Sequence, residues 1–455
     1  MGTMPVKKLV LNMALPMMAS MLVQALYNIV DSVFVSRLGE AALTAVSLAF
    51  PAQNLMIGLA TGMGVGMNAL LSRALGAKDH ERAQKAAENG LLLSMLSFLL
   101  FCCFGLFGSR IFMAAQTDVP AIIDYGTEYL RIVCGVSFGM YGSITFERYL
   151  QSTGRTVYSM VSQGVGAVLN IVLDPIFIFV LDMGVAGAAI ATVIGQIIGC
   201  CVGCYLNHTR NPEIRVDLRH LRPDLHVMGQ ICVIGFPSVL MVAIGSVMTF
   251  CMNKILILYT AGKETTATVF GVYFKLNSFA FMPVFGLNNG VVPIIAYNYG
   301  AQNRRRMTET IRFAVTLGVL LMLVGFGVFE LLPALLLSIF DASENMIAIG
   351  IPALRIIGLT FPFAGVSIVL GSVFQALGKS TYSMMNSFLR QLVVLIPAAY
   401  VLARVGMQLG NYDLVWWSYP IAEVVSLGVT LLFFRRLYRT LIAKIPENGG
   451  ERLSA

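Results

Sequence analysis

Residues 148–160 read RYLQSTGRTVYSM, and residues 372–384 read SVFQALGKSTYSM. A shift of 224 positions relates five identical residues of the two stretches, namely Gln151, Gly154, Tyr158, Ser159 and Met160 to Gln375, Gly378, Tyr382, Ser383 and Met384. The same shift relates two further glycine pairs, Gly62 and Gly66 to Gly286 and Gly290. The chain therefore consists of two halves with related sequences.

The composition places both halves in a membrane. Of 455 residues, 57% are hydrophobic and only 12% are charged, whereas about a quarter of the residues of a soluble domain are charged. Apolar runs near the ~20 residues that span a bilayer core recur from end to end. We predict twelve spans, at 9–35, 43–72, 86–112, 126–150, 157–181, 184–206, 229–259, 266–298, 308–337, 346–375, 383–405 and 414–440.

One period of the repeat covers six spans, and an even number of crossings gives both copies the same direction through the bilayer. The expected fold is an all-α polytopic membrane protein with twelve transmembrane helices in two parallel, pseudo-symmetric six-helix lobes. The predicted parts are a first lobe at 1–206, a polar linker at 207–228, a second lobe at 229–442 and a tail at 443–455. The first span runs past signal-peptide length without a small-residue cleavage site, so we expect it to remain in the protein.

The distribution of Lys and Arg residues along the chain explains the net charge of +8 better than binding to nucleic acid does. With both termini placed in the cytoplasm, 22 of the 31 Lys and Arg residues fall on the inner side, four on the outer side and five within spans. An excess of basic residues in cytoplasmic loops is the usual orientation signal. We therefore expect a multi-pass protein of the cytoplasmic membrane that does not bind nucleic acid.

Two acids lie inside apolar spans, Asp31 in LYNIVDSVFV (26–35) and Asp174 in NIVLDPIFIF (170–179). A bare carboxylate at the bilayer centre costs about 3 kcal/mol, so each acid needs a partner, a proton, water or an ion. At 1.5 Å per residue, both lie roughly 6–10 Å inside the outer boundary of their spans. Thr192 lies at about 12 Å by the same reckoning.

Helical spacing groups further polar residues with these acids. Asn170 shares a face with Asp174, and Asn28 shares one with Asp31. Proline has no backbone N–H, so Pro175 leaves a backbone carbonyl near Asp174 without its helical hydrogen bond. Carboxylate, amide, hydroxyl and carbonyl oxygens suit a hard cation, and two neighbouring carboxylates can also share a proton. We therefore predict a layer on three helices that binds H⁺ or Na⁺.

The competing interpretation is an internal ion pair between Arg131 and Asp31 or Asp174. The repeat disfavours this pairing, because Arg355 occupies the equivalent position in the second half without a matching aspartate. Glu147, near the inner end of its span, either reaches the interface or takes part in transport, and Gln151 is a further secondary candidate, as is Asn28. In the second half, Lys275 and Glu423 lie at similar depth, which predicts a structural ion pair.

With these features together, the chain resembles the multidrug and toxic compound extrusion (MATE) family, in its DinF-like and MepA-like bacterial branch. The resemblance rests on twelve spans, the repeat, and the LQSTGRTVYSM and FQALGKSTYSM loops. It implies a secondary antiporter that exports amphipathic, often cationic, drugs in exchange for H⁺ or Na⁺. It also implies a cation site formed by four residues of the first lobe, Asp31, Asn170, Asp174 and Thr192, and a bending role for Pro16.

Two other classes remain at this point. A lipid-linked oligosaccharide flippase of the same superfamily would share the fold but would need cations for pyrophosphate in its cavity. An intramembrane enzyme would need a catalytic constellation that the sequence does not show. Beyond the coupling ion we expect no cofactor and no structural metal, with small drugs and membrane lipids as partners of a monomer.

Overall fold

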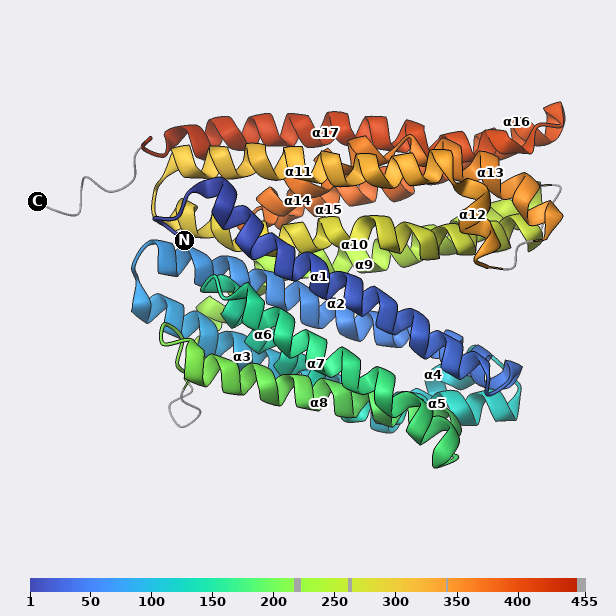
Figure 1. The fold of residues 1–455 in the computed structure, drawn as a ribbon, viewed down its shortest axis with the longest axis horizontal. Coiled ribbons are helices and arrows are strands. Elements are labelled where there is room, and N and C mark those ends of the chain that lie inside the picture. The colour runs from blue at the N-terminus through green and yellow to red at the C-terminus, as the bar shows by residue number, and fades with distance from the viewer. Residues whose placement is uncertain (217–221, 261–263, 341–342, 448–455) are drawn as a thin grey trace, which may run out of the picture.

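The computed structural model describes residues 1–216, 222–260, 264–340 and 343–447, and within these ranges the chain forms helices and no strand (Figure 1). The first half contains α1 Val6–Ser36, α2 Glu40–Gly76, α3 His80–Cys103, α4 Ser109–Ala114, α5 Pro120–Gly135, α6 Phe138–Ser152, α7 Thr156–Pro175 and α8 Gly184–Arg210. The second half contains α9 Leu225–Tyr259, α10 Glu264–Gly300, α11 Arg304–Leu331, α12 Pro333–Ser338, α13 Glu344–Gly358, α14 Phe361–Ala376, α15 Ser380–Phe388, α16 Ile396–Leu409 and α17 Ser418–Thr440. Short π-helical turns lie at Phe104–Gly108, Ile176–Val180 and Leu389–Leu395, and 3₁₀ turns at Tyr412–Trp417 and Ile442–Lys444.

Most of the predicted spans correspond to long apolar helices. Within the described ranges, ten helices are long and apolar enough to cross a membrane, and the pair α13 and α14, bent by 50°, makes an eleventh if it counts as one span. The predicted span 126–150 lies on α5 and α6, which are shorter helices with a break between them. Parts of the predicted linker and tail, 217–221 and 448–455, lie outside the described residues.

The repeat is visible in the helix limits. Adding 224 to the limits of α2 (40–76) gives those of α10 (264–300), and adding 224 to α4 (109–114) gives α12 (333–338). The pair α5 and α6 corresponds in the same way to the bent pair α13 and α14. Both halves therefore fold alike, as the sequence repeat predicts.

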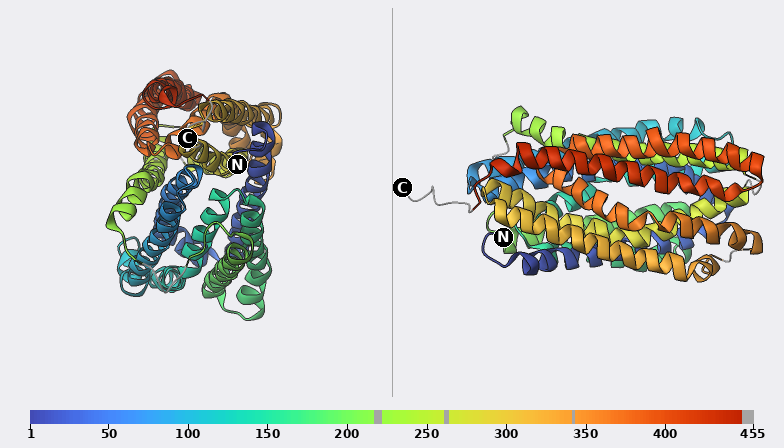
Figure 2. Two further views of the ribbon diagram at one scale, coloured as in Figure 1. Left: turned by 90° about the vertical axis from the view of Figure 1, so that its left-hand side faces the viewer. Right: turned by 90° about the horizontal axis from the view of Figure 1, so that it is seen from above.

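The two halves form two bundles that lie side by side (Figures 1 and 2). The described parts of both chain ends lie at one end of the molecule, called here the basic end because it carries Arg73, Arg155, Arg306 and Lys379. Towards that end α1 packs on α10 and α2 packs on α9, while the same helices diverge towards the opposite, far end.

Glycines allow this close contact between the bundles. A Cβ added to Gly66 on α2 would overlap the carbonyl oxygen of Ile231 on α9. On the other side, a Cβ added to Gly290 on α10 would lie 2.8 Å from backbone atoms of Ala14 on α1. These repeated glycines therefore lie where the backbones of two helices are in direct contact.

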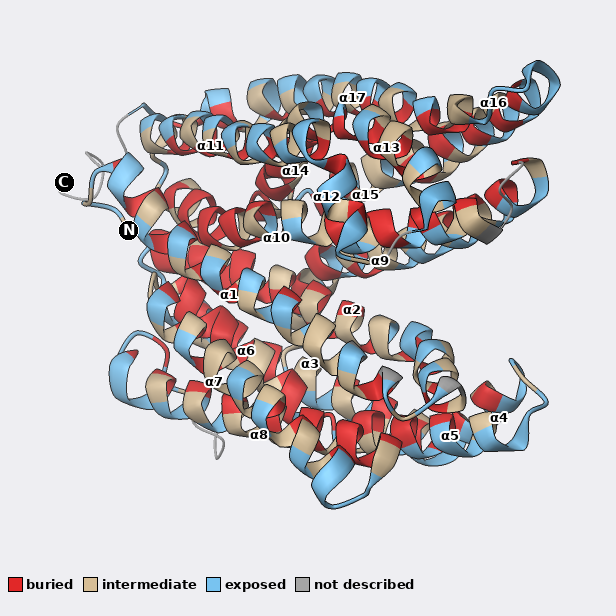
Figure 3. Ribbon diagram, turned by 45° about the vertical axis from the view of Figure 1, so that its right-hand side comes forward, coloured by how far each residue is buried: buried red, intermediate tan, exposed pale blue. Residues whose placement is uncertain are grey.

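Buried residues lie along these contacts between the two bundles (Figure 3). The first turns of α1 contribute Val10 and Ala14 to the same core cluster as Leu287 and Val291 of α10. The core of the second bundle therefore extends into the first. This shared apolar core holds the basic ends of the two bundles together.

Two prolines leave helical carbonyls without their usual donors. Pro16 cannot donate to the carbonyl of Asn12, and the Thr156 hydroxyl of α7 donates to that oxygen at 3.4 Å. Pro175 ends α7 and is followed by the π-helical turn Ile176–Val180. The Thr156 hydrogen bond ties α1 to α7, the two helices that carry the predicted acids.

Candidate functional site

Three helices of the first bundle bring the predicted acids together. Asp31 lies on α1, Asp174 on α7 and Thr192 on α8, and α7 packs on both of the others. The carboxyl groups of Asp31 and Asp174 are in hydrogen-bond contact with each other. Two bare carboxylates repel, so their proximity disfavours the form in which both groups are charged.

Asn170 and Thr192 form the inner wall of this site. Asp174 is completely buried, and Asn170 and Thr192 are 2% and 3% exposed. With the Asn170 amide turned to satisfy both of its ends, Nδ2 donates to Asp174 Oδ2 at 2.9 Å and Oδ1 accepts from Thr192 Oγ1 at 3.2 Å. The Thr192 backbone N–H donates to the same amide oxygen at 3.0 Å. The Asn170 side chain thus fixes the Asp174 carboxyl group relative to α8.

Tyr27 completes the site and was not identified from the sequence. Its side chain hydrogen-bonds with that of Thr192 and lies close enough to Asp31 and Asp174 to interact with their charges. It precedes Asp31 by four residues and so lies on the same face of α1. This spacing was the available signal, but a tyrosine in an apolar span is commonly a packing residue.

Two buried oxygens of the site have no hydrogen-bond partner in the described part of the chain, namely Oδ1 of Asp31 and Oδ1 of Asp174. Buried polar atoms are normally paired, so these two oxygens are exceptions among the described residues. The alternative pairing with Arg131 is wrong. That side chain is exposed on α5, and it takes part in none of the ion pairs between described residues.

Glu147 belongs to a second polar cluster and does not simply reach the interface. It is 4% exposed on α6 and accepts hydrogen bonds from Ser143, at 3.1 Å, and from Gln163. Gln163 in turn accepts a hydrogen bond from Ser20 of α1. The cluster therefore joins α6 and α7 to α1 without contacting the aspartate pair.

Gln151 belongs to a different polar network. Gln151 is fully buried, accepts from Arg148 at 2.8 Å and donates to Ser159 at 3.0 Å. Arg148 also donates to Asn289 of α10 at 3.3 Å, so this network connects the two bundles. Asn28 is exposed on α1.

The predicted ion pair between Lys275 and Glu423 is wrong, because Glu423 pairs with a different residue. Glu423 on α17 pairs with Arg390 at 3.1 Å, whereas the Lys275 ammonium lies 5.9 Å from the centre of the Phe340 ring. Similar depth did not make a pair of Lys275 and Glu423, because α17 packs on the turn Leu389–Leu395, which brings Arg390 to Glu423.

Comparison with known proteins relates the sequence and the fold to transporters. The MatE family profile matches residues 16–176 and 237–401. The chain is 26% identical to the multidrug export protein MepA of Staphylococcus haemolyticus (strain JCSC1435), covering 92% of this chain and 91% of the relative. It is also 26% identical to MepA of Staphylococcus aureus (strain MSSA476), over 94% of both chains.

Solved structures agree over almost the whole chain. A crystal structure of MATE in complex with MaL6 superposes with a TM-score of 0.91 at 27% identity, covering 97% of this chain and 98% of the other. An outward-facing multidrug resistance transporter of the MATE family superposes with a TM-score of 0.90 at 26% identity, with the same coverage.

Two repeated helical bundles with a buried polar site in one of them define a multi-span membrane transporter. Both matched segments of the family profile fall on the two halves of the repeat. The chain belongs to the MatE family.

Proposed function

We propose that this chain exports amphipathic, often cationic, compounds from the cell in exchange for H⁺ or Na⁺. Support for export comes from the printed names of its relatives, which describe multidrug export. Support for cation coupling comes from one observation, the contact of Asp31 and Asp174, each with a buried oxygen that has no partner among described residues.

The membrane orientation belongs to this proposal. The basic end faces the cytoplasm, as the excess of basic residues in its loops favours. The bundles meet at this end and diverge at the far end, so the arrangement in Figure 1 corresponds to an outward-facing transporter. One of the similar solved structures is also described as outward-facing.

Exchange follows from competition for the carboxyl pair. A proton or Na⁺ bound by Asp31 and Asp174 reduces the negative charge of the first bundle, which weakens its attraction for a cationic compound. The outward-facing state takes up the cation and releases the compound. The inward-facing state, in which the cation leaves, regains the charge and binds the compound again.

The direct test is efflux from proteoliposomes that contain the purified protein and ethidium. We expect an imposed H⁺ gradient or an imposed Na⁺ gradient, each applied alone, to drive ethidium transport in wild-type vesicles. Transport that ignores both gradients would refute antiport. Transport of a lipid-linked oligosaccharide without ethidium transport would instead identify a flippase.

A further inference from the structure

A cavity of ≈ 580 Å³ lies at the basic end, away from the aspartate pair. Its walls come from both bundles: Arg73 and Arg82 from the first, and Lys379, His226 and Tyr299 from the second. Arg73, Arg82 and Lys379 are called here the basic triad. The rest of the wall is largely apolar and includes Leu225 and Val233 of α9.

The basic triad has no carboxylate partner among the described residues. None of the ion pairs between described residues includes Arg73, Arg82 or Lys379. The Arg73 guanidinium lies 4.7 Å from the centre of the Tyr299 ring, and its buried Nε has no hydrogen-bond partner there. Arg82 donates to Gln230 at 3.3 Å. A smaller cavity of ≈ 190 Å³ shares Arg73, Arg82 and Tyr299 with the first one and adds Asp79, whose carboxylate accepts from the Arg82 backbone N–H at 2.9 Å.

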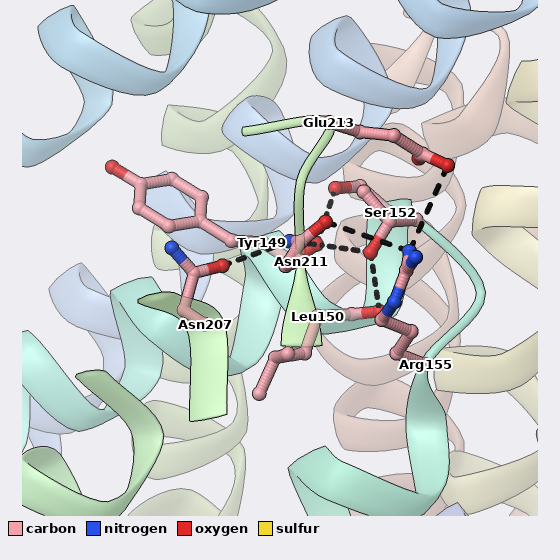
Figure 4. Close-up of polar contacts among 8 residues, drawn as sticks. Tyr149, Leu150, Ser152, Arg155, Asn207, Asn211 and Glu213 are labelled. Carbon is pink, nitrogen blue, oxygen red and sulfur yellow. Dashed lines mark hydrogen bonds and ion pairs between the residues drawn. The ribbon is translucent and has the colours of Figure 1, made fainter. Parts of the chain in front are cut away.

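The internal repeat provides a comparison within the same molecule. Subtracting 224 from Lys379 gives Arg155, and adding 224 to Arg82 gives Arg306. Arg155 pairs with Glu213 at 3.7 Å and donates to Asn211 at 3.5 Å (Figure 4). Arg306 donates to the Met1 and Met4 carbonyl oxygens, at 2.8 Å and 2.7 Å, although its buried Nε, like that of Arg73, has no hydrogen-bond partner among the described residues. Both repeat-related cations thus have partners within the chain, which the Arg73 guanidinium lacks in the described part of the chain apart from the Tyr299 ring.

The space beside the repeated glycine differs in the same way. A Cβ on Gly154 would lie 3.3 Å from the Met1 side chain, so the segment before α1 fills this position. A Cβ on the equivalent Gly378 would instead lie 3.1 Å from the Arg73 guanidinium, at the wall of the cavity. The segment before α1 thus covers Arg306 and the space beside Gly154, whereas the equivalent space beside Gly378 is lined by the basic triad.

The chemistry of this cavity suits a phosphate attached to a hydrocarbon. Guanidinium and ammonium groups bind phosphate through charge-assisted hydrogen bonds. Two apolar wall residues, Leu225 and Val233, are 82% and 69% exposed, and they lie on α9, a helix apolar enough to face lipid. Basic pockets between helices on the cytoplasmic side are suited to acidic headgroups. We propose that the basic triad binds the phosphate of an acidic phospholipid, with the acyl chains lying along α9.

Because the triad comes from both bundles, the lipid bridges them. Binding therefore favours the arrangement in which the basic ends meet over one in which they separate. Separation would divide Arg73 and Arg82 from Lys379. The proposal does not depend on the coupling ion or on the exported compound.

The test measures lipid binding to the full-length protein in detergent by native mass spectrometry and by thermal shift. Phosphatidylglycerol, phosphatidylcholine and inorganic phosphate are titrated separately. We expect wild type to prefer phosphatidylglycerol, and the double variant Arg73→Gln/Lys379→Gln to bind it at least tenfold more weakly, since a lost hydrogen bond to a charged group costs about tenfold in affinity. Lys379→Gln alone, which changes an exposed side chain, should show about a tenfold loss in a folded protein.

The matched control is Arg435→Gln/Arg436→Gln, which removes the same charge from two exposed residues that do not line the cavity. It should retain wild-type affinity. Equal losses in the control and the Arg73/Lys379 variant would overturn the proposal, as would equal binding of the two lipids by wild type. Competition by inorganic phosphate as strong as by phosphatidylglycerol would overturn the assignment to a lipid.

Discussion

Asp174 is fully buried on α7, and its contact with Asp31 joins that helix to α1. Asn170 and Thr192 hold the carboxyl group from one side, and Tyr27 reaches Thr192 from α1. The site thus consists of oxygen and amide groups with no basic side chain among its described contacts. Such a site changes its charge only by gaining or losing a small cation.

Asp174→Asn and Asp31→Asn should each abolish coupled efflux while the protein stays folded. An amide keeps the shape of the side chain and its hydrogen bonds but cannot hold the charge that binds H⁺ or Na⁺. The measurement is ethidium efflux from proteoliposomes, with size-exclusion profiles to verify folding. Asp118→Asn is the control, because Asp118 is an exposed acid outside this site, and it should transport normally. Wild-type rates in a folded Asp174→Asn variant would contradict the assignment.

Glu423→Gln should lower the stability of the second bundle, because it leaves Arg390 without its 3.1 Å partner. Glu423 is buried but Arg390 is 35% exposed, so we expect a loss of about 1–2 kcal/mol. Thermal denaturation in detergent is measured for Glu423→Gln, for Arg390→Met and for the double variant Arg390→Met/Glu423→Gln. Together with wild type, these proteins form a double-mutant cycle. Lys275→Met should show no coupling to Glu423→Gln. Coupling to Lys275 instead of Arg390 would contradict the pair.

At this scale the sequence predicted which residues share a depth but not which ones face each other. Helical rise places Asp31 and Asp174 in one layer, and the i,i+4 spacing adds Asn170. Depth alone also suggested Lys275 for Glu423, and only the packing of α17 on the turn Leu389–Leu395 selects Arg390. The rotation of a helix about its axis is set by its neighbours, which the sequence does not provide.

Among elements, the contacts of α2 with α9 and of α10 with α1 control how closely the bundles approach. Both contacts depend on glycines that lie directly against the opposite backbone. Larger side chains there would separate the helices, because backbone atoms cannot move aside as a flexible side chain can. These glycines therefore favour the arrangement in which the basic ends meet.

Gly290→Ala should destabilise this arrangement, since the added methyl group would lie 2.8 Å from the Ala14 backbone. We expect a loss of about 1–3 kcal/mol, typical of overpacking. The measurement combines thermal denaturation with spin-label distances across the basic end, which should lengthen. Gly271→Ala on the same helix is the control, because its Cβ would meet no atom within 4 Å. Equal behaviour of the two variants would show that the glycine contact does not hold the bundles together.

The helices were largely predictable from apolar runs and from the repeat. The exception is the region of α5 and α6, where the single predicted span 126–150 contains a break. Its residues Val136 and Ser137 carry no proline or glycine signal of their own, although Gly135 precedes them. Arg131 lies on the exposed side of α5, which the sequence pattern alone did not show.

For the molecule as a whole, exchange by competition means that the coupling cation lowers the affinity for the drug by the same factor as the drug lowers the affinity for the cation. Raising H⁺ or Na⁺ should therefore weaken the affinity for a monovalent cationic drug, and saturating drug should weaken cation binding equally. Drug binding to detergent-purified protein, measured from pH 5 to 9 with and without Na⁺, tests this prediction. Asp31→Asn should remove the dependence. An affinity that responds to neither cation, in wild type and variant alike, would refute the competition.

The basic cavity could not have been predicted from the sequence, because its walls combine residues from distant parts of the chain. Arg73 and Lys379 are more than 300 positions apart. Both cations also belong to the excess of basic residues that orients the chain, and this role is compatible with lipid binding, since in the proposed orientation the same charges face the acidic surface of the cytoplasmic leaflet.

The paired glycine contacts also bear on how such a chain arose. The surface of α2 that meets α9 is repeated on α10, which meets α1, so each half offers the other the same two surfaces. This is the geometry of an isologous homodimer, in which one patch serves both partners. A single six-span ancestor with these surfaces would already have been able to pair with a copy of itself. In the present chain the two halves have diverged, because only the first carries the acid pair, whereas both contribute to the basic cavity.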